Sequence, residues 1–301
     1  MDAGAIGPTL TDAAPAAAGR ALARPSSEWK LALPLVLFMT AFFVAPLAVL
    51  VAMSLHADNE MRVWSLAQYG KFLGDAFDLR ILGETMWLGV KATAVCLVFG
   101  YPLAWLAVRA RATWRTALVF LIVLPILTSV VVRTFSWIVI LGKQGVLNAA
   151  FAALGLIDEP MKLLFTETGV VIVLAQVQLP LVVLPLMTTL ARIDPNYAAA
   201  SAALGAGEWR TFFRVTLPLS VPGMVAGCIL AFAACVTAFV TQTLIGGARL
   251  VYMPLYIYQQ AVGANNWPFA SAMSVVFMFA VLAVVGLLAA AGRASRGHLY
   301  G

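Results

Sequence analysis

The chain has 301 residues, of which 62% are hydrophobic and 11% are charged, whereas soluble domains hold about 45–50% apolar and about 25% charged residues. This small number of polar side chains could not cover the surface of a soluble fold of this size. The composition therefore indicates a protein that lies in a lipid bilayer. The formal net charge is +6.

Residues 1–30 precede the first apolar stretch and are predicted to form a disordered cytoplasmic tail. Residues 1–27 are rich in Ala, Gly and Pro and show no hydrophobic periodicity. The cations Arg20, Arg24 and Lys30 resemble the charged start of a signal peptide. However, the apolar stretch that follows is too long for such a peptide and no cleavage site follows cleanly, so we expect an uncleaved span.

Six apolar stretches are long enough to cross about 30 Å of hydrocarbon, which takes about 20 helical residues. They lie at about 33–54, 83–108, 116–141, 168–190, 219–244 and 269–292. Lipid offers no partner to a free backbone N–H or C=O, and no alternating pattern suggests a barrel, so each should be a helix. The sequence therefore predicts an all-α integral membrane protein, with a six-span domain at 31–293 and a short cytoplasmic tail at 294–301.

The distribution of cations orients these spans. With the amino terminus inside, the inner segments hold eleven Lys and Arg residues and the outer segments hold six, while Lys91 and Arg133 fall within spans. Cytoplasmic loops carry the excess of cations, so both termini and the loop at 191–218 are predicted to be cytoplasmic. The net charge is thereby explained, and no nucleic acid partner is expected.

The loop at 191–218, between spans four and five, has the signals of a short helix. Asp194 can accept bonds from the first free N–H groups of a helix, and Pro195 suits its first turn. Residues 197–204 are mostly Ala, a strong helix former. Gly205 stands where a left-handed residue would end the helix.

A second short helix is expected at 208–215, where Arg210 and Arg214 lie among aromatic side chains. Pro218 is expected to prevent simple continuation into span five. We interpret the loop as a helical hairpin roughly in the membrane plane, whose small-sided first helix suits insertion into a groove. Its second helix could face lipid phosphates or an acidic partner. A loop that only anchors the bundle is the alternative.

Two cations inside the predicted spans, Arg133 and Lys91, are candidates for a translocation pathway, because a buried cation usually faces the bundle interior, a cavity or a counter-charge. Trp137, one turn after Arg133, is a candidate with it. The alternatives are a backbone cap at a broken span for Arg133 and a side chain that reaches the interface for Lys91. No Asp or Glu lies deep in a span, which disfavours a proton-coupled carrier and leaves a polyamine without an obvious carboxylate.

Catalytic and metal-binding patterns do not emerge from the sequence. Cys96, Cys228 and Cys235 all lie in predicted spans without metal-ligand spacing, and neither His56 nor His298 lies in a span. No Gly-x-x-x-x-Gly-Lys-Ser/Thr phosphate loop occurs, so any ATP that drives transport must be hydrolysed by a partner. We expect no enzyme activity, no cofactor and no metal.

The loop resembles the Glu-Ala-Ala, three residues, Gly, then Leu-Pro motif of binding-protein-dependent ABC transporter permeases. The matching residues are Ala200, Gly205, Leu217 and Pro218, while Ala199 replaces the expected Glu and Ser201 replaces the second Ala. The resemblance implies that this loop, with Arg210, couples the spans to an ATPase.

Other segments resemble the spermidine/putrescine-type branch of these permeases, from about residue 35 to 293. They are 100–105, 132–138, 145–148, 179–180, 184–185, 238–241, 246–247 and 266–268. In the segment that resembles the exit of span five, Phe239 and Gln242 join the pathway candidates, with Gln242 where Pro is usual.

This resemblance implies a multi-pass permease subunit of the bacterial inner membrane that imports a polyamine-like or related small solute. Its expected partners are membrane lipid, a dimer of ATPase subunits, a second permease and a periplasmic solute-binding protein. The resemblance favours a heterodimer of this chain with the second permease. The alternatives are an ion-gradient-driven secondary transporter and, least favoured, an intramembrane enzyme.

Overall fold

The computed structural model describes residues 28–300, with side chains described from 32 to 294. Residues 1–27 of the predicted tail lie outside the described residues. The described residues divide into two compact units, one that ends at residue 48 and one that begins at residue 49. The first unit holds most of α1 (Glu28–Ser54), whose apolar side chains, Phe42 and Phe43 among them, are exposed.

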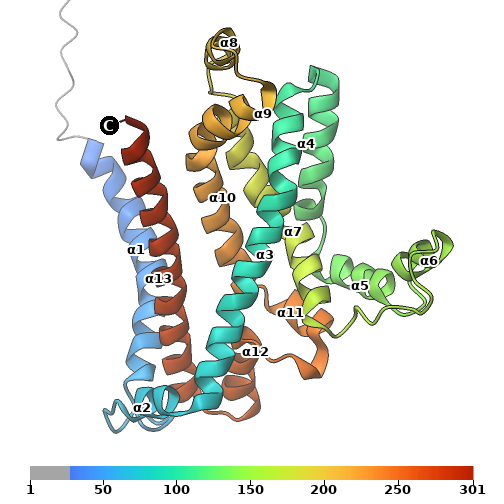
Figure 1. Ribbon diagram of the computed structural model, residues 1–301. Helices are drawn as coiled ribbons and strands as arrows, with labels where there is room; N and C mark the ends of the chain where they lie inside the picture. The colour runs from blue at the N-terminus through green and yellow to red at the C-terminus, as the bar shows by residue number, and fades with distance from the viewer. Residues whose placement is uncertain (1–27, 301) are drawn as a thin grey trace, which may run out of the picture. The chain divides into compact units, whose positions relative to one another are not determined.

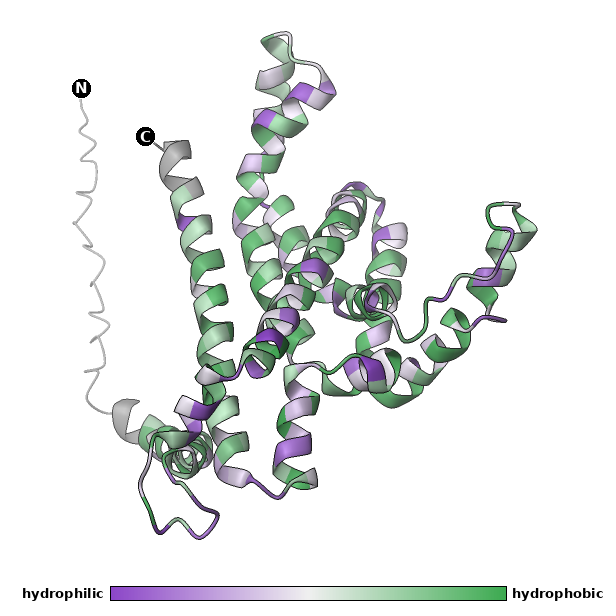
Figure 2. Cartoon of the chain, turned by 60° about the horizontal axis from the view of Figure 1, so that its bottom comes forward, coloured by the Kyte–Doolittle hydropathy of each residue, from purple (hydrophilic) through white to green (hydrophobic). Residues whose placement is uncertain are grey.

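The second unit is built from helices, and its described residues contain one isolated antiparallel bridge, between His56 and Trp64. The longer helices are α3 (Ala76–Arg109), α4 (Ala112–Leu127), α5 (Val130–Leu141), α7 (Glu167–Leu190), α10 (Leu217–Val236) and α13 (Trp267–Tyr300). The shorter ones are α2 (Ala67–Gly74), α6 (Val146–Ala153), α8 (Pro195–Ala203), α9 (Glu208–Thr211), α11 (Phe239–Gly246) and α12 (Met253–Tyr258). Hydrophobic residues dominate the long helices, and hydrophilic residues gather mainly at helix ends and connections (Figure 2).

Six stretches within the described residues are long and apolar enough to cross a membrane, which confirms the predicted number of spans. They are Ala32–Ser54, Ala76–Arg109, Val130–Ala153, Glu167–Leu190, Glu208–Val236 and Trp267–Ala294. Four of them agree with the predicted positions. The third and the fifth differ from the prediction, and each difference has a local cause.

The predicted third span, 116–141, is not one helix. It breaks between α4 and α5, where Thr128 and Ser129 are extended. In a continuous helix the Pro125 carbonyl would accept from the N–H of Ser129. Here it accepts from the Thr128 hydroxyl, at 2.9 Å, and from the Arg133 guanidinium. Two side chains therefore replace the missing backbone donor to the Pro125 carbonyl.

The predicted fifth span, 219–244, begins earlier and breaks sooner than expected. Helix α9 runs through a π-helical turn, η1 (Phe212–Thr216), directly into α10 (Leu217–Val236), so Pro218 does not interrupt the helix. The N–H of Leu217 donates to the Phe212 carbonyl, one residue farther back than in an α-helix. This wider turn gives the Pro218 ring room against the preceding turn, with which it would clash in a regular helix.

Helix α7 lies at the centre of the second unit. It packs along α3 and α10, and these two helices also pack on each other, while α13 packs on α10 (Figure 1). Fully buried side chains of α3 and α7, including Leu88, Val173 and Leu186, fill the space between the helices. The ends of α7 therefore fix where the segments on either side of it can lie.

Small residues on α10 allow close approach to α7. Gly223, Gly227 and Ala231 recur every four residues and are buried. A Cβ at Gly227 would lie 2.9 Å from the Cα of Val182 on α7. Because this neighbour is backbone rather than a side chain that can move, the two helices are in contact at this glycine, as small residues permit in membrane bundles.

Candidate functional site

The first helix of the 191–218 loop has the ends that the sequence predicts. The Asp194 carboxylate accepts from the N–H of Asn196 at 2.9 Å, and Pro195 occupies the first turn of α8. Gly205 has φ +80°. Its N–H donates to the Ala202 carbonyl at 2.9 Å, and the N–H of Ala206 donates to the Ser201 carbonyl at 3.1 Å. This pair of bonds is the Schellman arrangement that ends a helix at a left-handed glycine.

A side-chain contact joins the two helices of the loop. The hydroxyl oxygens of Ser201 on α8 and Thr211 on α9 lie 2.9 Å apart, within hydrogen-bond distance. Ser201 is the residue that departs from the second Ala of the resembled motif. The departure therefore supplies a link between α8 and α9 that an alanine could not make.

The outer surface of this hairpin is exposed. None of the residues of α8 is buried, and Ala199, Ala200 and Arg210 are all exposed. Leu204 is 89% exposed and Trp209 is 77% exposed. In contrast, Leu217 and Pro218 are partly buried where the helix enters the bundle. The small alanine side chains of α8, flanked by Leu204 and Trp209, are thus available to a partner, without the carboxylate that a Glu at position 199 would offer.

An aromatic cluster anchors the base of the hairpin to α3. The ring of Phe212 stands edge-to-face with Tyr101 and Trp105, at centroid distances of 5.6 and 6.5 Å. The Arg109 guanidinium lies 3.9 Å from the Trp105 ring centroid. The Tyr101 hydroxyl lies 3.1 Å from that of Ser220 on α10. This anchor was not predicted from the sequence, although the four-residue spacing of Tyr101 and Trp105 on α3 was an available signal.

Arg133 and Trp137 line one cavity of about 380 Å³. The Trp137 indole N–H donates to the Gln176 side-chain carbonyl of α7 at 3.1 Å, and Gln176 also lines the cavity. The Nε of Arg133 is buried without a hydrogen-bond partner among the described residues. The structure thus brings two of the pathway candidates together and adds Gln176, while the Arg133 guanidinium also caps the break after α4.

Lys91 lies apart from that cavity. Its ammonium pairs with the carboxylate of Glu167, at the start of α7, and lies 5.7 Å from the Trp87 ring centroid. The Lys91 side chain is 29% exposed and that of Glu167 is 46% exposed. The cation is therefore balanced by a carboxylate that the sequence places on another helix.

Gln242 spans the break between α10 and α11. Its side-chain amide donates to the carbonyls of Cys235 and Val236, at 2.8 and 3.2 Å, in place of the backbone donors that a continuous helix would supply. The side chain is 1% exposed, and its Oε1 has no partner among the described residues. The Phe239 ring packs against that of Tyr258, at a centroid distance of 5.4 Å. Helix α11 packs on α5 and α7, which places both residues near the Trp137 side of the bundle.

Comparisons with known proteins agree on one kind of protein. The family described as "Binding-protein-dependent transport system inner membrane component" matches residues 16–295. The spermidine/putrescine transport system permease protein PotB of Haemophilus influenzae is 36% identical over 61% of this chain, and the match spans 64% of that relative, just under two thirds of it. PotB of Salmonella typhimurium is 33% identical over 75% of this chain and 77% of its own length.

A solved structure has the same fold. It is that of a bacterial ABC transporter involved in the import of the acidic polysaccharide alginate, with a TM-score of 0.71 and 18% identity. The match covers 90% of this chain and 96% of that one. A second structure of an alginate ABC transporter contains a pentasaccharide-bound periplasmic protein. At this identity the likeness concerns the fold alone.

Proposed function

Because the chain belongs to the family of binding-protein-dependent transport system inner membrane components, we propose that it is the permease subunit of an ATP-driven importer. In this role it lies in the bacterial inner membrane with both termini in the cytoplasm. The hairpin of α8 and α9 docks on a separate ATPase dimer, where ATP is hydrolysed. A second permease, in a heterodimer, completes the pathway, and a periplasmic binding protein delivers the solute.

The observation that carries the proposal is the construction of the hairpin. Helix α8 is capped at both ends, exposed on its outer surface and joined to α9 through Ser201 and Thr211. Helix α9 continues through η1 into α10 without a break. A displacement of α8 by the ATPase therefore passes into a membrane-spanning helix, and through Phe212 into α3. Such a connected element could be biased both by the ATPase and by the binding protein.

The translocation pathway on this chain runs past the cavity of Arg133, Trp137 and Gln176, with Phe239 and Gln242 on the neighbouring helix. Lys91 contributes to it through its pair with Glu167. The names of the PotB relatives support a polyamine-like solute. Since the second permease supplies the other half of the pathway, this chain alone does not set the selectivity.

The experiment that tests the proposal uses two glycines of the hairpin. Gly205 has φ +80°, whereas Gly207 has φ −71° and is extended, and neither would bring a Cβ within 4 Å of another atom. Gly205→Val should therefore distort the end of α8, while Gly207→Val controls for the added side chain. The full transporter is purified through this chain, and the ATPase that remains bound and ATP-driven uptake are measured.

We expect Gly205→Val to lose the ATPase and the uptake together, and Gly207→Val to retain both. An ATPase that stays bound to a well-expressed Gly205→Val chain with normal uptake would overturn the docking role. Uptake by this chain alone, driven by an ion gradient without ATP, would instead support a secondary transporter.

A further inference from the structure

A second cavity, which is lined by cations, lies at the end of the bundle opposite the hairpin of α8 and α9. Its volume is about 730 Å³, and it is lined by Lys143, Lys162 and Arg249 together with apolar side chains and Thr166. We call it the basic cavity. No Asp or Glu lines it. The three cations come from segments far apart in the sequence: the turn after α5, the segment before α7, and η2 (Gly247–Arg249).

The position of the basic cavity follows from α7. Thr166 immediately precedes this helix, and the 191–218 loop follows its other end. A helix of 24 residues is about 36 Å long, about the thickness of the hydrocarbon core. Likewise, η2 lies past the end of α10 that is away from the hairpin (Figure 1). If the hairpin faces the cytoplasm, the basic cavity faces the periplasm.

The segments that carry the cations are tied to one another. The buried side-chain amide of Asn148 donates to the carbonyls of Gly142 and Met161, at 3.1 and 3.0 Å, and its oxygen accepts from the N–H of Met161. These backbone groups adjoin Lys143 and Lys162. The two lysines are therefore held in one frame rather than on independent loops.

The third segment is fixed to the same frame. The N–H of Phe165 donates to the Ile245 carbonyl at 3.0 Å. Gly247 has φ +63°, and a Cβ there would lie 2.5 Å from the Phe165 ring. Only a glycine allows this close contact, which brings η2 and Arg249 against the segment before α7.

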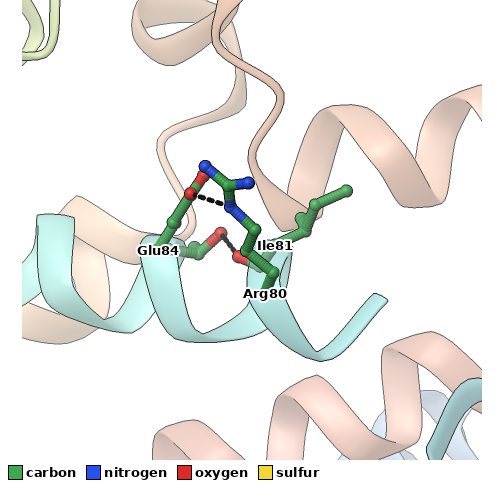
Figure 3. Close-up of polar contacts among 4 residues, drawn as sticks. Arg80, Ile81 and Glu84 are labelled. Atoms are coloured by element: carbon green, nitrogen blue, oxygen red, sulfur yellow. Dashed lines mark hydrogen bonds and ion pairs between the residues drawn. The ribbon is translucent and has the colours of Figure 1, made fainter. Parts of the chain in front are cut away.

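The three cations of the basic cavity differ from the others at this end of the bundle. Arg62 pairs with Glu60 at 2.7 Å. Arg80 pairs with Glu84, also at 2.7 Å (Figure 3). The ammonium of Lys71 lies 4.2 Å from the Phe269 ring centroid. In contrast, Lys143, Lys162 and Arg249 are exposed and make no ion pair or side-chain hydrogen bond among the described residues.

We propose that the basic cavity receives acidic side chains on the surface of the periplasmic binding protein. The inference rests on the permease role proposed above. Three like charges around one concavity repel one another until an anionic group neutralises them, and such complementarity speeds and orients the association of two proteins. The cavity lies among exposed segments at helix ends and shares no residue with the Arg133 cavity, which favours a protein surface over a solute in transit.

The test measures binding of the transporter's purified periplasmic binding protein to the full transporter in lipid nanodiscs, with and without solute. Lys143→Glu, Lys162→Glu and Arg249→Glu are made singly and together. Arg62→Glu is the matched control, because it reverses a similarly exposed charge at the same end that lies outside the cavity. A photo-crosslinking residue at Ala248 identifies the segment of the binding protein that lies against the cavity.

We expect each reversal to weaken binding about tenfold, and the triple variant about a hundredfold or more. High salt should weaken binding to the native transporter in the same direction. Arg62→Glu should bind normally, basal ATPase activity should persist in all variants, and crosslinks should map to an acidic segment.

Native binding to the triple variant would overturn the inference while leaving the permease role intact. So would variants that bind the solute-free protein normally and lose only the effect of added solute, because the cavity would then hold the solute itself. If the native transporter neither binds the protein nor carries an ATPase, the proposed function fails as well.

Discussion

The hydroxyl oxygens of Ser201 and Thr211 lie 2.9 Å apart and join the two helices of the 191–218 hairpin. The contact is partly buried, whereas the other residues of α8 are exposed. This side-chain link therefore helps to hold α8 to the helix that continues into α10.

Removal of either hydroxyl should loosen α8. Ser201→Ala and Thr211→Val should each increase the hydrogen exchange of the α8 amides, because each removes a hydrogen bond worth about 0.5–1.5 kcal/mol. The double variant should exchange little faster than either single variant, because one substitution already breaks the bond. ATP-driven uptake should fall more than ATPase binding, since the link transmits motion rather than docking. Thr188→Ala is the control, because among the described residues its hydroxyl bonds only to the Leu184 carbonyl of its own helix. Additive effects of the two substitutions would contradict the link.

The close contact of α10 with α7 predicts a strong effect of one methyl group. Gly227→Ala places a Cβ 2.9 Å from the Cα of Val182, so the helices must separate, at a cost of about 1–3 kcal/mol of stability. Gly286→Ala on α13 meets no atom within 4 Å and should be neutral or slightly stabilising. Thermal unfolding in detergent compares the two variants, and equal midpoints would contradict the packing of α10 on α7.

The pair of Lys91 with Glu167 should contribute little to stability. Both side chains are partly exposed, and such ion pairs are usually worth about 0.2–1 kcal/mol. A double-mutant cycle of Lys91→Gln and Glu167→Gln, followed by thermal unfolding, should give a coupling energy within that range. The coupling should shrink at high salt, because exposed charges are screened. A larger coupling that salt does not change would mean that the pair is buried in the assembled transporter.

The ends of α8 could be predicted because they depend on nearby residues. Asp194 and Gly205 act on backbone groups within a few positions, and the structure confirms both of these effects. A backbone cap at a broken span was one of the two roles expected for Arg133, and its guanidinium does cap the Pro125 carbonyl, but the positions of the breaks at Thr128 and Thr237 were not predicted. A hydropathy window averages over about 20 residues and does not register that the Arg133 and Gln242 side chains can replace the backbone donors at a break.

Contacts that depend on how the helices pack against one another could not be predicted from the sequence either. The chain gives no sign that Ser201 would face Thr211, or that the partner of Lys91 would be Glu167, because these contacts form only once the helices are packed. Lys143, Lys162 and Arg249 entered the sequence analysis only as charges of the outer segments. The fold brings them around one cavity, and this arrangement, which their number alone does not reveal, is what suggests a binding site for acidic groups.

Arg133 permits a prediction that separates its two roles. The guanidinium caps the Pro125 carbonyl and lines the cavity with Trp137. Arg133→Met removes both the donor and the charge, which leaves that carbonyl with only the Thr128 hydroxyl and should cost about 1–3 kcal/mol of stability. Arg133→Gln removes the charge but keeps an amide that can reach the carbonyl, so its unfolding midpoint should stay closer to the native one.

Uptake kinetics then decide whether the charge acts on the solute. If Arg133 lies on the pathway, Arg133→Gln should change the KM for solute although the protein remains stable, and Arg133→Lys should restore part of the native value because it keeps a positive charge in the cavity. If the residue only holds the break between α4 and α5, uptake should follow stability across the three variants. A stable Arg133→Gln transporter with native KM and kcat would remove Arg133 from the pathway and leave it the role of a backbone cap.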